Sequence, residues 1–246
     1  MKILSWNILA NEFIKQSYYD MIPSQILFNR PKRQERIIET LKEANADIML
    51  LQEVMQSEYN KLADEFQRTY HLLKGKHIHW QNKRSYSGNV ILFRKSMFSL
   101  TNKQLDLNFG LAVQVYLKHS HSEIPILVIN VHLDDLSQAK RLREIKEIEM
   151  LFQNHPHIIL GGDFNEHYNP KHITKLYNAL KAYYFTLTNH EPTYYINSKA
   201  CIDHIMIKGF ETHNKNSKVI NEYGNNSVEQ FTNYGSDHLP VMLTIQ

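Results

Sequence analysis

The chain contains a single cysteine, Cys201, among its 246 residues. One thiol can form neither an internal disulfide nor a zinc site built from several thiolates, which is typical of proteins from reducing compartments. No run approaches the roughly 18 consecutive apolar residues of a membrane span. Asn11, Glu12 and Lys15 also interrupt the N-terminal region where a secretory signal needs an apolar core. We therefore expect a soluble, cytoplasmic protein that does not enter a membrane.

Glycine and proline are scarce, and positive and negative charges are nearly balanced. The 8 glycines and 7 prolines are scattered, so the sequence shows neither a flexible linker nor an obvious repeat. A net charge of +3 allows a polyanionic partner without indicating one. Hydrophobic residues make up 42% of the chain, which is enough for one large core. We expect a single domain over residues 1–246 that acts as a monomer.

The spacing of apolar residues predicts an α/β fold. Helices are expected at 33–43 and 57–70, in a segment capped at 134–137 and extending to Phe152, and at 169–180. Strands are expected at 3–6, 47–51, 71–74, 89–93, 112–117, 126–131, 158–160, 202–208 and 241–245. Because consecutive strands interrupt the alternation of helices and strands, the sheets should be mixed. Two stacked sheets with helices outside would bury these apolar runs. The polar stretch 212–226 is expected to be a surface excursion.

Polar side chains follow the apolar, strand-like runs. The carboxyl ends of strands are where sheet folds usually gather ligands. The residues found there are rich in oxygen and imidazole groups, which suit a hard divalent cation and a phosphate. They are Asn7, Glu53, His132, Asp163, Asn165, Asp203, Asp237 and His238. We expect them to meet in one polar site at the edge of a sheeted core.

Several of these residues also have a structural interpretation. Asn7 can begin a turn, and an isolated histidine such as His132 is more often structural than catalytic. Glu53 can cap a following helix. A carboxylate directly after a buried run otherwise needs a cation or hydrogen bonds to offset its desolvation. Asp163 and Asn165 flank an aromatic residue after two glycines, and an extended backbone there would aim both polar groups the same way.

The order of these motifs resembles one known superfamily. The matching stretches are Trp6-Asn7, Leu51-Gln52-Glu53-Val54, His132-Leu133, Gly162-Asp163-Phe164-Asn165, Ile202-Asp203 and Ser236-Asp237-His238. They stand in the order expected for the endonuclease/exonuclease/phosphatase superfamily, which includes DNase I, abasic-site endonucleases, sphingomyelinases and inositol-polyphosphate phosphatases. The resemblance spans residues 3–245. It implies a four-layered α/β sandwich, with two stacked mixed sheets flanked by helices, and Mg²⁺-dependent cleavage of phosphate esters with Mn²⁺ as a substitute ion.

The flanking residues are similar to one branch of that superfamily. The stretches that carry this similarity are Trp6–Ala10, Tyr18-Tyr19, Arg33, Arg36-Ile37 and Asn45–Ile48. They resemble the poly(A) deadenylases of the carbon-catabolite-repressor type, together with nocturnin, the Angel proteins and the 2′-phosphodiesterases. This branch often places a base-stacking aromatic shortly before the Ile-Asp pair. The chain has Ser198 there instead, and Tyr194 and Tyr195 are the nearest substitutes.

The resemblance and the chemistry of the side chains together suggest a role for each residue. Glu53, with Asn7 and Asp237, is expected to hold the Mg²⁺ that polarises the scissile phosphate. Asp163 is the candidate for orienting and deprotonating the attacking water, and Asn165 would fix water or phosphate by hydrogen bonds. A metal-bound hydroxide remains the alternative base.

Two histidines are the candidates for contacting the phosphate itself. His238 would donate to a non-bridging oxygen, and Asp203 would accept a hydrogen bond from its other ring nitrogen and favour the imidazolium. His132 would be a second donor. Phosphate contacts of this kind complete the acid, base and metal set of a hydrolase.

Substrate contacts are harder to predict. Two basic groups either steer nucleic acid or lie on solvated helix faces: Lys32, Arg33 and Arg36, and Lys140, Arg141 and Arg143. Recognition of single-stranded RNA favours exposed aromatics that stack bases, and Tyr194, Tyr195 and Trp80 are the candidates. Trp6 and Phe164 are expected to pack beneath the site.

The sequence therefore favours a metal-dependent phosphodiesterase, most similar to a 3′-5′ exoribonuclease of the poly(A)-deadenylase type acting on single-stranded RNA. The alternatives are other esters: 2′-5′ or 2′,3′-cyclic phosphates, tyrosyl-DNA ends, abasic DNA and inositol phosphates. The last would normally bring Cys-Asp-Arg where this chain has Ile202-Asp203-His204. A catalytically inactive RNA-binding module is a further alternative, although it would not need this acid/base set. The natural substrate, the polarity of digestion and the number of metals stay open.

Overall fold

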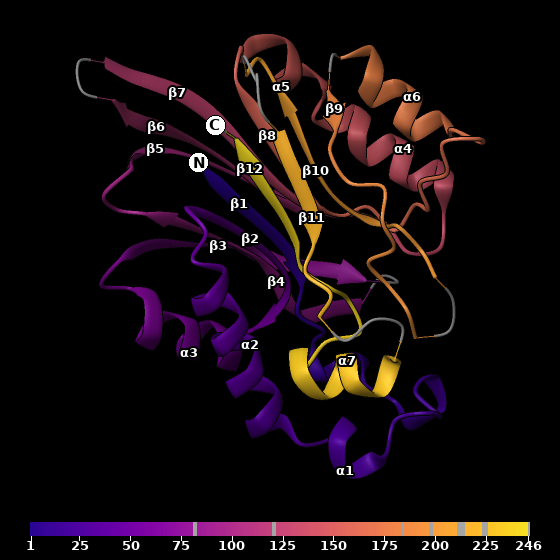
Figure 1. Cartoon of the computed structure of the whole chain (residues 1–246). Helices are drawn as coiled ribbons and strands as arrows, with labels where there is room; N and C mark the ends of the chain where they lie inside the picture. The colour runs from indigo at the N-terminus through magenta and orange to yellow at the C-terminus, as the bar shows by residue number, and fades with distance from the viewer. Residues whose placement is uncertain are drawn as a thin grey trace.

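Two six-stranded sheets stack face to face between two layers of helices, as Figure 1 shows. The computed structural model describes residues 1–80, 83–119, 122–183, 185–196, 199–210, 215–222 and 226–245. The arrangement confirms the predicted four-layered α/β sandwich with mixed sheets.

The first sheet contains the two ends of the described chain. Its strand order is β11-β12-β1-β2-β4-β3. Its strands are β1 (Lys2–Asn7), β2 (Ile48–Met55), β3 (Tyr70–Trp80), β4 (Lys83–Arg94), β11 (Lys215–Val219) and β12 (Val241–Ile245). β1 pairs in parallel with β2 and antiparallel with β12. The parallel pair brings the carboxyl ends of β1 and β2 to the same edge of the sheet.

The second sheet has the order β5-β6-β7-β8-β10-β9. Its strands are β5 (Phe98–Leu107), β6 (Gly110–His119), β7 (Ser122–His132), β8 (Ile158–Asp163), β9 (Thr186–Leu187) and β10 (Asp203–Lys208). β7 and β8 are parallel, whereas β8 and β10 are antiparallel. His132 lies opposite Asp163 in one pair, and Asp163 lies opposite Asp203 in the other. Three predicted site residues are therefore neighbours by strand register alone.

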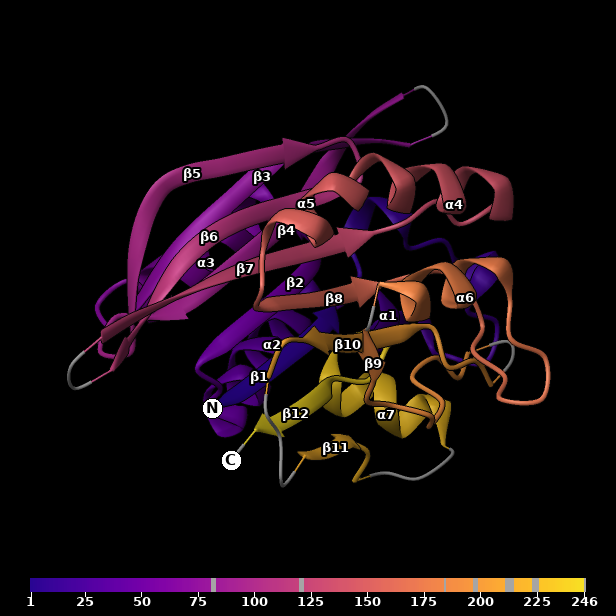
Figure 2. The ribbon, with the colours of Figure 1, turned by 90° about the horizontal axis from the view of Figure 1, so that it is seen from above.

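Helices cover the outer faces of both sheets. They are α1 (Ser24–Leu27), α2 (Arg30–Ala44), α3 (Gln56–Phe66), α4 (Gln138–Glu147), α5 (Glu149–Asn154), α6 (Lys175–Ala182) and α7 (Ser227–Tyr234). α2 and α3 pack on the first sheet, and α4, α5 and α6 lie on the side of the second sheet (Figures 1 and 2). Two short 3₁₀ turns, η1 (Asn11–Phe13) and η2 (Gln16–Tyr18), lie between β1 and α1.

Over most of its length, the core between the two sheets consists of aliphatic and aromatic side chains. Ile3, Leu50 and Ile91 of the first sheet pack with Val128 and Ile159 of the second. Each of these side chains is completely buried, and removing one such side chain from water contributes about 1.5–3 kcal/mol. The strands that carry the polar residues are thus held by apolar packing, and the polar residues lie at the ends of this layer.

Some predicted boundaries moved because local turn chemistry overrides apolar spacing. The helix expected to continue to Phe152 is divided at Ile148, whose φ and ψ of −100° and 4° lie outside the α-helical range. The helix expected from Asn169 begins only at Lys175, because Asn169 first caps a turn by accepting from the amide of Lys171. The stretch expected as an excursion contains β11, and its residues 212–214 and 223–225 lie outside the described part.

Among the residues that the structure describes, no helix has both the length and the apolar composition that crossing a membrane requires.

Candidate active site

Glu53 reaches the site through a β-bulge in β2. The pairing register between β2 and β4 shifts between Leu51 and Val54, and Glu53 has φ +59°. A left-handed conformation costs a non-glycine residue about 1 kcal/mol or more, so such residues persist only where surrounding contacts hold them. Here the amide of Ala10 donates to Oε2 at 2.8 Å and the side-chain amide of Asn7 donates to Oε1 at 2.8 Å. Glu53 therefore is not a helix cap: α3 starts later and has no side-chain cap.

Asp163 links the two sheets. Its Oδ2 accepts from Nδ2 of Asn7 at 3.1 Å. Nε2 of His132 lies 3.7 Å from Oδ2 of Asp163 and 3.9 Å from Oε1 of Glu53. The carboxyl ends of β1, β2, β7 and β8 thus meet at one point, as the strand-end pattern predicts. Asp203 differs in one respect, because it opens β10 and does not follow a strand.

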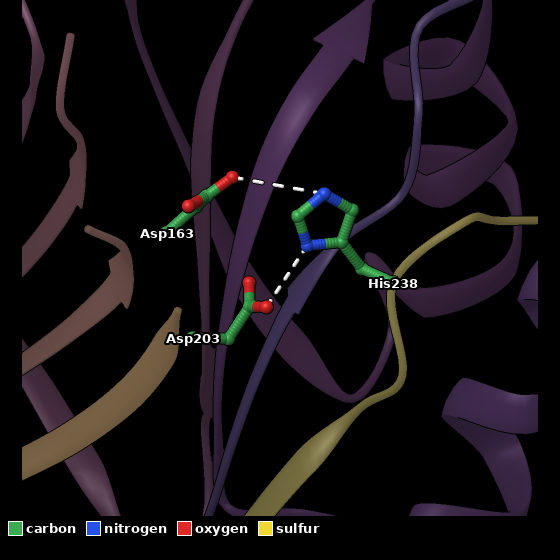
Figure 3. Close-up of side chains that lie close together, drawn as sticks. All are labelled: Asp163, Asp203 and His238. Atoms are coloured by element: carbon green, nitrogen blue, oxygen red, sulfur yellow. Dashed lines mark hydrogen bonds and ion pairs between the residues drawn. The ribbon is translucent and has the colours of Figure 1, made fainter. Parts of the chain in front are cut away.

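His238 is aligned between two carboxylates, as Figure 3 shows. Its Nδ1 lies 2.9 Å from Oδ2 of Asp203, and its Nε2 lies 3.8 Å from Oδ2 of Asp163. Trp6 donates from its indole nitrogen to the carbonyl of His238 at 2.9 Å, and Ser236 accepts from its amide at 3.2 Å. The predicted packing role of Trp6 beneath the site is therefore accompanied by a hydrogen bond that fixes the histidine backbone.

Burial and charge act in opposite directions on these groups. Burial by itself lowers the pKa of His238, but the carboxylates of Asp203, Asp237 and Asp163 outweigh it and raise that pKa well above its usual value. Burial raises the pKa of Glu53, against the opposing effects of His132 and of the hydrogen bond from Asn7. The surroundings therefore favour the protonated, cationic form of His238, whereas burial disfavours the ionised form of Glu53.

The carboxylates also leave acceptor atoms without donors. Oδ2 of Asp237 accepts from the hydroxyl of Tyr19 at 3.0 Å. Oδ1 of Asp237 and Oδ1 of Asp203 are buried and have no hydrogen-bond partner within the described residues. Asp163, Asp203 and His238 also bring ligand atoms within 4.8 Å of one another. Buried carboxylate oxygens that lack donors are what a hard divalent cation requires, so the residues present fit a metal ion.

The side chains of Asn7 and Asn165 already form hydrogen bonds with atoms that could otherwise contact a metal ion or a phosphate. Asn7 points its nitrogen at the carboxylates, while its Oδ1 accepts from the amide of Leu9 at 3.0 Å. Asn165 has φ +48°, donates its amide to Oδ1 of Asp163 at 2.8 Å and its Nδ2 to the carbonyl of Leu133 at 2.9 Å. Both residues therefore position the carboxylates in addition to any contact with a ligand.

These groups open into one cleft of about 390 Å³. Its lining includes Glu53, His132, Asp163, Asn165, Asp237 and His238, together with Leu9, Glu12, Phe13, Lys15, Tyr18, Tyr19 and Asp135. The predicted catalytic and metal-binding residues thus share one cavity, with Asn7 and Asp203 directly behind it. The aromatic and charged residues of the segment after β1 form its other wall. In the sequence, Leu9 and the Tyr18-Tyr19 pair belong to stretches that carry the family resemblance, but nothing in the composition of this segment distinguishes it from an ordinary loop.

Three of the residues predicted to contact the substrate, all in the described part of the chain, do not line the cleft. Arg141 is 9% exposed and donates from Nε to Oε2 of Glu166 at 2.6 Å, so it forms a buried structural ion pair. Tyr194 packs its ring against that of His238 with centroids 5.3 Å apart. Tyr195 packs against the outer core of the first sheet. None of the three is among the lining residues of the cleft that the structure describes. Ser198 and the side chain of Trp80 lie outside the described part.

Of the basic group Lys32, Arg33 and Arg36 on α2, the two arginines also form contacts within the fold. Arg33 is 5% exposed and donates to the carbonyls of Gly235 and Leu9 at 2.8 and 2.7 Å. Arg36 pairs with Glu39 at 2.7 Å on the same helix. Buried guanidinium groups that satisfy backbone carbonyls are anchors, so Arg33 does not steer nucleic acid.

Comparison with known proteins agrees with this geometry. The endonuclease/exonuclease/phosphatase family model matches residues 4–238. The CCR4-Not complex 3′-5′-exoribonuclease subunit Ccr4 of Aspergillus fumigatus is 28% identical over 165 residues, covering 53% of this chain but only 23% of that protein. The chain therefore spans well under two thirds of this relative's length.

Two solved structures have the same fold. ANGEL2, described as a 2′,3′-cyclic phosphatase and bound to adenosine-2′,3′-vanadate, superimposes with a TM-score of 0.74 at 16% identity, covering 98% of this chain and 94% of that chain. The human nocturnin catalytic domain with bound sulfate gives 0.68 at 18% identity, covering 100% and 93%. These structures share the fold, and the family match over nearly the whole chain shows that the protein belongs to the endonuclease/exonuclease/phosphatase family of metal-dependent hydrolases of phosphoester bonds.

Proposed function

We propose that the protein is a Mg²⁺-dependent phosphodiesterase that shortens single-stranded RNA from its 3′ end, as a poly(A) deadenylase does. We extend the proposal to a cytoplasmic monomer with a single domain over residues 1–246. The observation that supports it most is the line formed by Asp203, His238 and Asp163, because His238 and Asp163 share one cleft with Glu53. The similarity to an exoribonuclease subunit favours RNA over other esters.

Glu53 is the residue we assign to the metal ion, with Asp237 and Asn7 beside it. The carboxylate of Glu53 lines the cleft and its burial raises its pKa, while Asp237 keeps an acceptor oxygen without a donor. A bound Mg²⁺ would supply positive charge that polarises the phosphate and offsets the charge that develops on the leaving oxygen. Asn7 bridges the carboxylates of Glu53 and Asp163, because its Nδ2 donates to both.

Asp163 is the residue we assign to the attacking water. Its two oxygens already accept hydrogen bonds from Asn7 and from the amide of Asn165, so its orientation is fixed before substrate binds. A fixed carboxylate can align a water molecule and accept its proton without reorganising. Asn165 lies next to it at the cleft and would hold the water or a phosphate oxygen.

His238 is the residue we assign to the developing negative charge. Asp203 accepts from Nδ1, which leaves Nε2 as the donor facing the cleft, and the raised pKa keeps the ring protonated at neutral pH. A charged donor aimed at a non-bridging oxygen is worth more in the transition state than in the ground state. His132 would act as a second donor from the opposite sheet.

An RNA and DNA panel tests the proposal. End-labelled poly(A), mixed-sequence RNA, 2′-5′ linked RNA, RNA with a 2′,3′-cyclic end, abasic DNA and tyrosyl-capped DNA are incubated with Mg²⁺ or with a chelator. We expect metal-dependent single-nucleotide steps from the 3′ end of RNA, and a loss of about 10²- to 10⁴-fold in Glu53→Gln and Asp163→Ala. The exposed Glu35→Gln on α2 is the matched control.

Each other outcome redirects the proposal. Opening of the cyclic end without shortening would assign a 2′,3′-cyclic phosphodiesterase, and one internal cut would assign an endonuclease. Absence of metal-dependent turnover on every member of the panel would favour a binding module, and full activity of Asp163→Ala would remove Asp163 from the mechanism.

A further inference from the structure

We propose that the segment Leu9–Tyr19, called here the aromatic wall, binds the nucleobase of the nucleotide whose phosphate is attacked, with Tyr18 as the stacking ring. This inference rests on the proposed function, because it names what the same cleft recognises. The wall contributes Leu9, Phe13, Lys15, Tyr18 and Tyr19 to the lining of the catalytic cleft.

The wall is attached to the catalytic centre at both ends. At one end the amide of Ala10 donates to Oε2 of Glu53 at 2.8 Å. At the other end the hydroxyl of Tyr19 donates to Oδ2 of Asp237 at 3.0 Å. Side chains between these two contacts line the same cleft as Glu53 and His238, so they lie within a nucleotide's reach of a phosphate held there. No other segment of the described chain contributes an exposed large aromatic side chain to the cleft.

Hydrogen bonds and ring packing hold the wall in place. Arg33 donates from Nη2 to the carbonyl of Leu9 and from Nη1 to Oδ1 of Asn11, both at 2.7 Å. The ring of Tyr19 packs against that of Phe231 with centroids 6.0 Å apart, and Tyr19 is 5% exposed. In Figure 1 the indigo chain after β1 lies at the same end of the molecule as α1 and α7. A fixed wall loses little conformational entropy when a base docks, which favours affinity.

The exposed part of the wall suits a base better than a phosphate. Tyr18 is 54% exposed at the cleft, and Nζ of Lys15 lies 5.4 Å from the centroid of its ring. The charges of the wall nearly cancel, because Glu12 lines the cleft beside Lys15. Attraction of the RNA backbone is therefore not the main contribution of the wall. An aromatic face next to a phosphate centre is the usual means of holding an unpaired base.

A single exposed tyrosine is ordinary on protein surfaces, so the exposure of Tyr18 does not by itself indicate a binding role. Its position in the cleft does. Phe28 provides the internal comparison, because it is also 54% exposed and follows α1 outside the cleft. If exposure alone mattered, the two rings would be equivalent. Only Tyr18 combines exposure with a place on the cleft wall.

Binding of adenosine 5′-monophosphate and of ribose 5-phosphate separates base from phosphate recognition. Calorimetry with the Mg²⁺-loaded protein should give tighter binding of the nucleotide, and chromatography after each run confirms that it stays intact. We expect Tyr18→Ala to weaken nucleotide binding by about 5- to 150-fold and to leave ribose 5-phosphate binding unchanged. Tyr18→Phe should retain the affinity, and Phe28→Ala should match the wild type.

In kinetic measurements, we expect Tyr18→Ala to raise the KM for oligo(A) and to leave kcat nearly unchanged. The melting temperature of Tyr18→Ala should equal that of the wild type within experimental error. Equal affinity for the two ligands, no measurable nucleotide binding, or an unchanged affinity in Tyr18→Ala would each overturn the proposal. If Tyr18 governs nucleotide binding while no RNA is shortened, the proposed reaction fails and the base-binding wall stands.

Discussion

At the scale of single residues, the raised pKa of His238 makes a prediction about pH. The ring is protonated at neutral pH, so catalysis should fall only as alkaline pH exceeds its raised pKa. Burial lowers that pKa and the Asp203 carboxylate is the first group that raises it again. Replacing Asp203 by Asn removes this charge, so the alkaline limb of the rate profile should move to lower pH. Hydrolysis of a generic phosphodiester, measured against pH, checks the shift.

The matched control for this prediction is Asp64→Asn, because Asp64 is an exposed carboxylate on α3. It should leave the profile unchanged. Superimposable alkaline limbs for the wild type and Asp203→Asn would contradict the pairing of Asp203 with His238 as the source of its charge.

Glu53 makes a second prediction at this scale. Its carboxyl group is buried near Asp237, and burial raises its pKa, so a cation bound beside it would stabilise the ionised form. A cation that binds only the folded state stabilises it by about 2.7 kcal/mol at a concentration of 100 Kd. Mg²⁺ should therefore raise the melting temperature of the wild type, and Glu53→Gln should lose most of that rise. Thermal melts with Mg²⁺ and with chelator test this, and equal Mg²⁺-induced shifts in both proteins would exclude Glu53 as the main ligand.

The site residues divide into those that sequence can and cannot identify. Asp163 and His238 follow recognisable motifs, so their approach to one another was predictable once the fold was known. The orientation of the Asn7 side chain was not predictable, because it depends on the hydrogen bond that the backbone amide of Leu9 donates to Oδ1 of Asn7. The predicted contact of Arg141 with substrate depends on a similar unknown. The sequence does not show that Glu166, from another segment, forms an ion pair with this helical arginine.

At the scale of elements, an amide network behind the site supports the β2 bulge. Asn130 on β7 donates from Nδ2 to the carbonyls of Leu51 and Val90 at 2.9 and 3.0 Å. Its Oδ1 accepts from Nε2 of Gln52 at 2.7 Å. These bonds cross between the sheets and satisfy a carbonyl next to the register shift that places Glu53. We therefore expect the network to hold the bulge that orients the Glu53 carboxylate.

Removing this network should affect both stability and catalysis. Asn130→Ala removes a donor from two buried carbonyls and the acceptor of the Gln52 side-chain amide, and a buried group left unsatisfied costs about 1–3 kcal/mol. We expect the free energy of unfolding to fall by about 2–4 kcal/mol and kcat to fall at temperatures where the variant is still folded. Urea unfolding and single-turnover rates measure the two effects. Asn60→Ala, exposed on α3, should change neither, and a normal kcat in Asn130→Ala would show that the bulge does not depend on the network.

Element types were predictable where apolar periodicity was long, as in α2 and β7, and boundaries were not. β3 runs to Trp80 although only residues 71–74 read as strand, since cross-strand pairing with β4 extends it beyond its own apolar run. The division of α4 from α5 at Ile148 likewise leaves the apolar spacing intact. Such features depend on tertiary partners, which the local pattern does not contain.

At the scale of the whole molecule, the two sheets contribute opposite halves of the site. The first sheet supplies Asn7 and Glu53, and the second supplies His132, Asp163 and Asp203. The strand order that brings them together includes neighbours far apart in sequence, such as β1 with β12 and β8 with β10. Periodicity alone predicts the layers but not this order. The polar residues that follow the strand-like runs, together with the order of the motifs, indicated that the strand ends would converge.

The distribution of charge over the molecule makes the last prediction. The net charge is only +3, and Arg33 and Arg141 are buried in structural contacts. Within the described residues, Lys15 is the one lysine or arginine that lines the cleft. If about one or two RNA phosphates are neutralised by side chains, the slope of log(kcat/KM) against log[KCl] should be about −0.7 to −1.4 at fixed Mg²⁺. Rates on oligo(A) between 50 and 200 mM KCl measure this slope. Lys15→Gln should make the slope less negative, and Lys32→Gln, at an exposed position, should leave it unchanged. A slope steeper than about −3 would mean that four or more phosphates contact basic side chains, and the substrate path would then have to extend over a basic surface beyond the cleft.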